Sequence, residues 1–232
     1  MVVTLPFYLT WVLEKLPGFN MILFWIGPLL CLMFSVWIEL RIAAKISTKA
    51  ALTYYLAVLS IGFFFTFFVS FTKNWILLSM GFSIVMLGFA GDFIHHNPMR
   101  ADTIDYDFWK VSGERREGLY SGIGPLLSKP MISVALALPT TIMSFFGLVY
   151  VAEAQSLQAT QGLDMAMLSL NISMALIPGI TALIGLIIWV KFYPLTGEVV
   201  KEMKKELSKI HEQRKIDYEK KQLQEEGSPQ EK

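Results

Sequence analysis

The chain has 232 residues, of which 54% are hydrophobic and only 17% are charged, and its formal net charge is +1. Soluble domains carry about 25% charged residues, so this composition excludes an ordinary soluble protein and places most of the chain in a lipid bilayer. Positive and negative charges are interleaved, which argues against a nucleic-acid partner. The single cysteine, Cys31, excludes a disulfide within the chain.

The first part of the sequence predicts one partial and three complete membrane helices. Residues 1–13 are apolar but would cover only about 20 Å as a helix, against a hydrocarbon core of about 30 Å. We expect them to end a helix that begins elsewhere, or to form an interfacial or re-entrant helix. The segments 19–40, 50–72 and 75–97 are each long enough to span. The third segment is predicted to continue past Asp92, because a helix ending at Gly91 would be slightly shorter than the hydrocarbon core is thick.

The second part predicts two further spans, at residues 119–151 and 165–192, so the membrane bundle covers residues 1–193. Gly118 lies just before the first of these spans and Gly122 lies within it. The two glycines have the small-xxx-small spacing that lets helices approach closely. Residues 194–232 are highly charged and predict a helical tail with a modest amphipathic face. We expect this tail to be solvated and its end to be disordered.

The distribution of positive charge predicts the orientation. The loops at Arg41–Lys49 and Arg100–Arg116 and the tail are rich in Lys and Arg, whereas the alternate loops are not. The positive-inside rule then places these loops and the C-terminus in the cytoplasm. We expect a multi-pass protein of the cell membrane.

Lys129 is the one charged residue inside the apolar segment that starts near Leu119. Nine or ten helical residues put it about 15 Å deep, in the middle of the core. A charge there costs about 2.5–3.5 kcal/mol on insertion scales, so it normally faces a water-filled cavity or a carboxylate. The alternatives are a structural ion pair or a lysine beside water at a helix bend.

Asp92, His95 and His96 lie in the cytoplasmic half of the segment 75–97 and are candidate cavity-lining residues. The two histidines are adjacent, so they project about 100° apart and cannot form the i, i+4 pair of a metal site. We therefore predict no metal, and take one histidine, His95, as the cavity-lining residue.

The segment ADTIDYDFWKVSGERREGLYSGIGPLLSKP resembles the loop between the tenth and eleventh helices of the glycoside–pentoside–hexuronide:cation symporters. This is the melibiose carrier group of the major facilitator superfamily. The basic loop at Arg41–Lys49 and the motif YPLTGE at Tyr193–Glu198 agree with that likeness. Ser112 in place of the usual Thr, and Pro130 after the lysine, depart from the family pattern. The residues that match the family pattern are Ala101, Asp102, Asp105, Tyr106, Gly113, Arg115, Arg116, Glu117, Gly118 and Lys129.

The resemblance implies an all-α transmembrane fold, namely half of a major facilitator superfamily bundle with about five full helices and one partial N-terminal helix. It implies the C-terminal half of a symporter for a small solute, such as a sugar or glycoside, coupled to H⁺ or Na⁺ and using no other cofactor. The partner would be an N-terminal six-helix half, as a separate chain or as another part of the same protein. That half holds the family's main cation-binding carboxylates.

The resemblance also implies roles for single residues. Lys129 would pair with a carboxylate of the other half, Asp92 would face the cavity, and Phe93 would stack on the solute or simply pack. A cluster of ion pairs would close a cytoplasmic gate, although ordinary loop charges that fix the topology are the alternative. The gate residues would be Asp102, Asp105, Arg115, Arg116 and Glu117.

Two other classes of function were weighed. An enzyme is not expected, because the sequence has no nucleophile paired with a base, no H-E-x-x-H motif and no glycine-rich phosphate loop. The alternative to a transporter half is a non-transporting membrane subunit or fragment that binds a partner membrane protein through its glycine faces.

Overall fold

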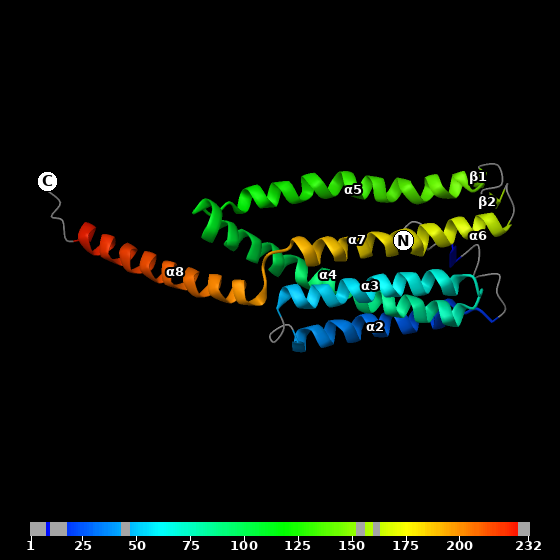
Figure 1. Cartoon of the computed structure of the whole chain (residues 1–232), viewed down its shortest axis with the longest axis horizontal. Helices are drawn as coiled ribbons and strands as arrows, with labels where there is room; N and C mark the ends of the chain where they lie inside the picture. The colour runs from blue at the N-terminus through cyan, green and yellow to red at the C-terminus, as the bar shows by residue number, and fades with distance from the viewer. Residues whose placement is uncertain (1–7, 10–17, 43–46, 152–155, 160–162, 227–232) are drawn as a thin grey trace.

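The computed structural model describes residues 8–9, 18–42, 47–151, 156–159 and 163–226. Long helices dominate it, and two of them continue into short π-helical segments (Figure 1). The elements are α2 (Met21–Ile42), α3 (Thr48–Ser70), α4 (Trp75–Tyr106), η2 (Asp107–Ser112), α5 (Glu117–Phe145), β1 (Leu148–Val151), β2 (Ser156–Ala159), α6 (Leu163–Asn171), η3 (Ile172–Leu176), α7 (Ile177–Phe192) and α8 (Gly197–Glu226).

Within the described residues, five helical segments are long and apolar enough to cross a membrane. This confirms the all-α transmembrane fold, to which the structure adds one small antiparallel hairpin of β1 and β2. The expected partial helix at 1–13 lies outside the described residues except for Tyr8 and Leu9. Both of these are buried, and the Tyr8 hydroxyl donates a hydrogen bond to the Ser70 carbonyl (3.3 Å).

Helices α3 and α4 form a tight antiparallel pair. Asn74 begins α4 by accepting hydrogen bonds from the backbone N–H groups of Ile76 (3.0 Å) and Leu77 (3.3 Å), which have no partner within the helix. Along the interface, a Cβ on Gly88 would lie 2.5 Å from the backbone nitrogen of Leu59. The two backbones therefore approach as closely as they do only because small residues separate them.

Helix α2 packs on the other side of α4. At one end, Phe24 and Phe82 are fully buried with ring centroids 5.7 Å apart, and the Ser79 hydroxyl donates to the Phe24 carbonyl (2.7 Å). Further along, the Ser35 hydroxyl donates to the Leu87 carbonyl (2.8 Å). The pairs run in the same sequence direction, so α2 and α4 are parallel neighbours joined by polar as well as apolar contacts.

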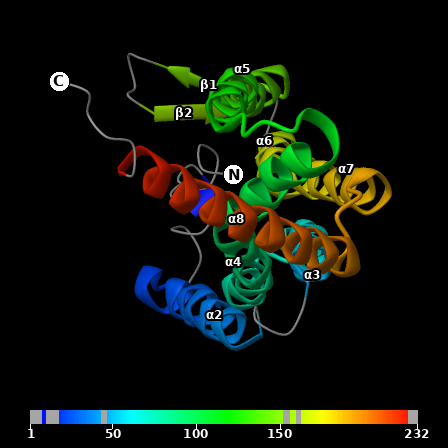
Figure 2. The same ribbon diagram turned by 90° about the vertical axis from the view of Figure 1, so that its left-hand side faces the viewer.

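Helix α5 stands at the edge of the molecule, away from α2 and α3, in both views (Figures 1 and 2). Its residues are exposed over most of its length, and Pro139 and Met143 near its end are its buried residues. No atom lies within 4 Å of a Cβ placed on Gly118, Gly122 or Gly124. The prediction that Gly118 and Gly122 mediate close packing is therefore wrong for contacts within this part of the chain.

Two predicted helix ends differ from the structure. The segment 75–97 continues through Pro98 to Tyr106 and into η2, because a helix does not stop where hydropathy falls when its next turns have packing partners. The segment 119–151 ends as a helix at Phe145, and Gly147 with φ 77° then turns the chain into β1. Glycine adopts that left-handed conformation without steric cost.

Candidate functional site

Four charged residues, Arg100, Asp105, Arg115 and Glu117, gather where the end of α4 lies beside the start of α5. A cavity of about 350 Å³ opens there, and the Arg100 guanidinium donates across it to the Tyr120 carbonyl (3.4 Å). The cavity is lined by Asn97, Arg100, Ala101, Ile104, Asp105, Arg115, Glu117 and Ser121. Both helices therefore contribute polar groups to one space.

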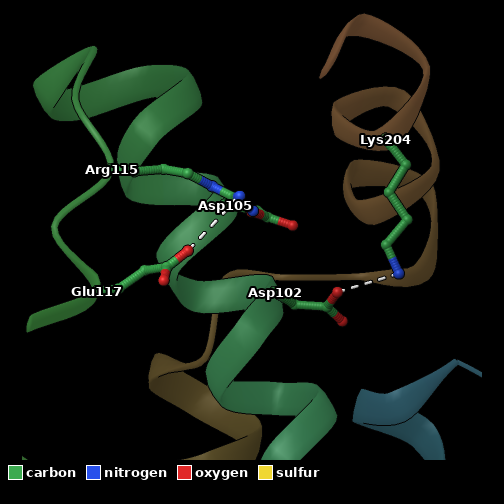
Figure 3. A network of polar contacts seen from close by, with 5 residues as sticks. All are labelled: Asp102, Asp105, Arg115, Glu117 and Lys204. Atoms are coloured by element: carbon green, nitrogen blue, oxygen red, sulfur yellow. Dashed lines mark hydrogen bonds and ion pairs between the residues drawn. The ribbon is translucent and has the colours of Figure 1, made fainter. Parts of the chain in front are cut away.

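Arg115 joins the two helices through a pair of carboxylates (Figure 3). One guanidinium nitrogen lies 2.9 Å from Asp105 Oδ1 on α4, and another lies 3.5 Å from Glu117 Oε1 at the start of α5. The hydrogen bond to Asp105 raises the pKa of Arg115 above its ordinary value. Three of the five predicted gate residues thus form one ion-pair cluster, called the Arg115 cluster below. The fourth, Arg116, is exposed and forms no ion pair within the described residues.

Asp102, the fifth predicted gate residue, belongs to a different contact. Its carboxylate lies 3.1 Å from the Lys204 ammonium on α8, and its side chain is only 6% exposed (Figure 3). The structure therefore separates Asp102 from the Arg115 cluster and uses it to hold the tail helix.

The tail helix α8 is docked on η2, so the prediction of a solvated tail is wrong for its first half. Met203 and Leu207 are buried against Phe108. The Trp109 indole N–H donates to Glu206 (2.9 Å), and the guanidinium carbon of Arg214 lies 5.3 Å from the centroid of the Phe108 ring. The amphipathic spacing of the tail indicated an apolar face. The residues that this face packs against, on η2, lie about 95 residues away in sequence, so the local sequence could not identify them. The expected disordered end, residues 227–232, lies outside the described part of the chain.

Lys129 is exposed on α5, and no carboxylate in the described residues pairs with it. Met143 follows fourteen residues later, about four helical turns, so the two side chains project from nearly the same face. Met143 is 3% exposed and packs in the core cluster with Leu170 and Met174. Lys129 therefore lies on the side of α5 that turns toward the bundle, in a stretch that nothing in the described chain covers.

The remaining predicted pathway residues lie on α4. Asp92 and Phe93 are part of that helix, but their side chains lie outside the described part of the structure. His95 is not cavity-lining in the structure: it is 4% exposed and its ring nitrogen pairs with Glu39 of α2. Sequence analysis missed Glu39 as a partner because a carboxylate near the end of a span looks like a helix-terminating charge. No group of three or more potential metal ligands occurs among the described residues.

Five helices of membrane length among the described residues define a multi-pass membrane protein, and a charged cavity lies where two of them meet. Residues 1–197 match the sequence profile of the family described as MFS/sugar transport protein, and the chain belongs to that family and so to the major facilitator superfamily. This membership indicates a sugar-transporter type of function rather than an enzyme. Neither a curated protein nor a solved structure matches the chain.

Proposed function

We propose that this chain forms one bundle of a cation-coupled symporter of the melibiose carrier type, and that the second bundle is an N-terminal half. The solute is a sugar or glycoside, and the coupling ion is H⁺ or Na⁺. In such transporters the two bundles rock about a site at the middle of the membrane. The chain would lie in the cell membrane with α8 in the cytoplasm, as the Lys/Arg-rich loops indicate. The observation that carries the proposal is the uncovered polar face of α5.

That face has a clear chemical character. On a helix with 3.6 residues per turn, Gly118, Gly122, Lys129, Ser133 and Thr140 fall within one sector of about 60°, and Leu136 at its edge is the large apolar residue there. The opposite side of α5 is made of large apolar residues, namely Ile123, Leu127, Met131, Val134 and Leu138. A helix surrounded by lipid gains nothing from a polar sector, so a partner bundle or an aqueous space is expected to cover it.

Lys129 has a specific task in this arrangement. Its ammonium is expensive to leave in hydrocarbon, so a carboxylate of the other bundle would stabilise it when the carboxylate is free of cation. A cation or a solute bound at that carboxylate would compete for it. Asp92 and Phe93 on α4 are proposed to lie at the same pathway, as a polar and a stacking group.

The Arg115 cluster is proposed as part of the cytoplasmic gate. It joins α4 to α5 at the end of the bundle expected to face the cytoplasm, and relative movement of these helices must break it. Exposed ion pairs contribute from about 0 to 1 kcal/mol each. Contacts of that size can bias two conformations that differ by a few kcal/mol without locking either.

A second candidate is a non-transporting subunit that binds a membrane protein through α5. The open space around Gly118, Gly122 and Gly124 favours it, because small residues are the usual contact points between membrane helices. Both candidates need a partner on the same face. They differ in whether solute passes along the covered face of α5.

The deciding experiment is cation-driven uptake of a radiolabelled galactoside into vesicles that contain the chain with a six-helix partner half. We expect accumulation against a gradient, and its loss in Lys129→Ala. Lys191→Ala, at the end of α7, is the matched control and should retain uptake. Undiminished accumulation in Lys129→Ala would remove this lysine from the mechanism. A stable two-bundle complex without uptake would support the non-transporting subunit.

A further inference from the structure

Glu39 of α2 and His95 of α4 form a buried pair that neither the charged cavity nor the α5 face uses. The carboxylate and the imidazole Nε2 are in direct contact, and their side chains are only 3% and 5% exposed. Buried ionisable groups are costly unless they are paired, and a pair inside a membrane bundle marks a functional site by default. The question is what these two groups hold between them.

The surroundings of the pair are built from a third helix. Tyr55 of α3 is 5% exposed, its hydroxyl interacts with Glu39 and with Ser35, and its ring centroid lies 6.1 Å from that of His95. Gly91 makes room for this ring, since a Cβ there would lie 2.1 Å from Tyr55 Cγ. Tyr55 therefore covers the pair and supplies it with a polar group.

Few charged groups lie near the pair among the described side chains. Tyr54 on α3 and His96 on α4 are both exposed. Among the described side chains of α2, α3 and α4 that pack around the pair, Glu39, Tyr55 and His95 are the buried titratable groups. Among the described side chains of these helices, no buried lysine or arginine can compensate a free carboxylate, and the side chains of Arg41 and Asp92 lie outside the described part of the structure.

We propose that Glu39 and His95 form a proton-binding site that holds one proton between α2 and α4. With one proton the pair has no net charge, either as carboxylate with imidazolium or as carboxylic acid with imidazole. Removing that proton leaves a buried carboxylate without a cation. Adding a second leaves a buried imidazolium without an anion. Both charged states are penalised in an apolar interior.

The position of the pair gives its protonation a mechanical consequence. Glu39 lies three residues before the last residue of α2, Ile42, and so near the end of the helix expected to face the cytoplasm. At the other end, α2 is fixed to α4 by the buried rings of Phe24 and Phe82. A change in proton number would therefore loosen one end of α2 and leave the other held. One end of α2 would therefore move relative to α4 when the number of bound protons changes.

The first test is NMR of His95 in the full chain, with His96 and His211, the other two of its three histidines, replaced by glutamine. We expect an imidazole N–H signal shifted downfield by its contact with the Glu39 carboxylate. Glu39→Gln should remove the downfield signal. A His95 N–H signal that is the same with and without Glu39 would overturn the proposal.

The second test separates a proton site from a merely structural contact. The midpoint of thermal unfolding in detergent should fall at acid pH in the parent protein. It should vary less with pH in the double variant Glu39→Gln/His95→Gln, in which the charged states cannot form. Equal pH profiles for the two proteins would contradict the proposal. Neither readout depends on solute transport, so failure here is distinguishable from failure of the proposed function.

Discussion

The α3 and α4 pair and helix α5 are both rich in glycine, yet they use it in opposite ways. A Cβ on Gly88 of α4 would lie 2.5 Å from a backbone atom of α3, whereas one on Gly122 of α5 would meet no atom within 4 Å. The α3 and α4 glycines complete an interface inside the chain. The glycines of α5 leave a surface open, and under the proposed function a partner bundle or water covers it.

This difference decides what each region does. The pair α3 and α4, with α2 beside them, is a packed unit in which Phe82, Val85 and Ala90 are almost completely buried. Helix α5 is attached mainly at its end, near Met143, and by the ion pairs at its start. A scaffold needs the first kind of packing, and a moving or partner-binding helix needs the second.

The largest effect is expected from filling a glycine in the packed pair. Gly88→Val would place side-chain atoms against the backbone of Leu59, which cannot move aside as a flexible side chain can. Overpacking of a well-packed interface typically costs about 1–3 kcal/mol and sometimes more. We expect a clear fall in the thermal unfolding midpoint of the purified chain in detergent.

Gly122→Val is the matched control on α5. Because a Cβ at Gly122 would have no contact within 4 Å from another part of the described chain, the unfolding midpoint of the variant should stay close to the parent value. Its assembly with a partner bundle, measured by co-purification, should be impaired. Equal destabilisation by the two substitutions would contradict the distinction between the two regions.

A smaller, local effect is expected at the tail. Met203 is fully buried against Phe108, and truncation of a buried methionine costs about 2–5 kcal/mol. Met203→Ala should release α8 from η2 and speed its cleavage by an added protease, while the midpoint for the membrane helices stays unchanged. Lys201→Ala, exposed on the same helix, is the control. A cleavage rate that does not change would show that α8 is not held by this contact.

The smallest effect on stability is expected at the Arg115 cluster. The Arg115 side chain is 51% exposed, so Arg115→Gln should change the free energy of unfolding by less than about 1 kcal/mol. Arg115→Gln should instead change the populations of the conformations, because it removes contacts that join α4 to α5. Distances between spin labels at the ends of these helices would broaden, while Arg116→Gln would leave them as in the parent. Identical distances in both variants would exclude a gating role.

Sequence alone predicted five complete spans, the number found among the described residues, because hydropathy and helix length report directly on the bilayer. The positions of Asp105, Arg115 and Glu117 were also predicted as a cluster, from charges brought close by one short connection. The sequence did not predict the pairing of Glu39 with His95 or of Asp102 with Lys204. Those partners lie on helices distant in sequence, and no local periodicity specifies which helices become neighbours. The hairpin was missed for another reason: the apolar residues Leu148–Val151 suit a strand as well as the end of a span.

The central claim is that the α5 face carrying Lys129 meets water or protein rather than lipid. In a variant without Cys31, single cysteines at Ser133 and Met131 lie at similar depth but project about 160° apart. In membranes that contain the assembled protein, we predict that Ser133→Cys reacts with a membrane-impermeant thiol reagent and is protected by solute, and that Met131→Cys does not react. Reaction at Met131→Cys alone would show that the Lys129 face is turned to lipid and would contradict the account.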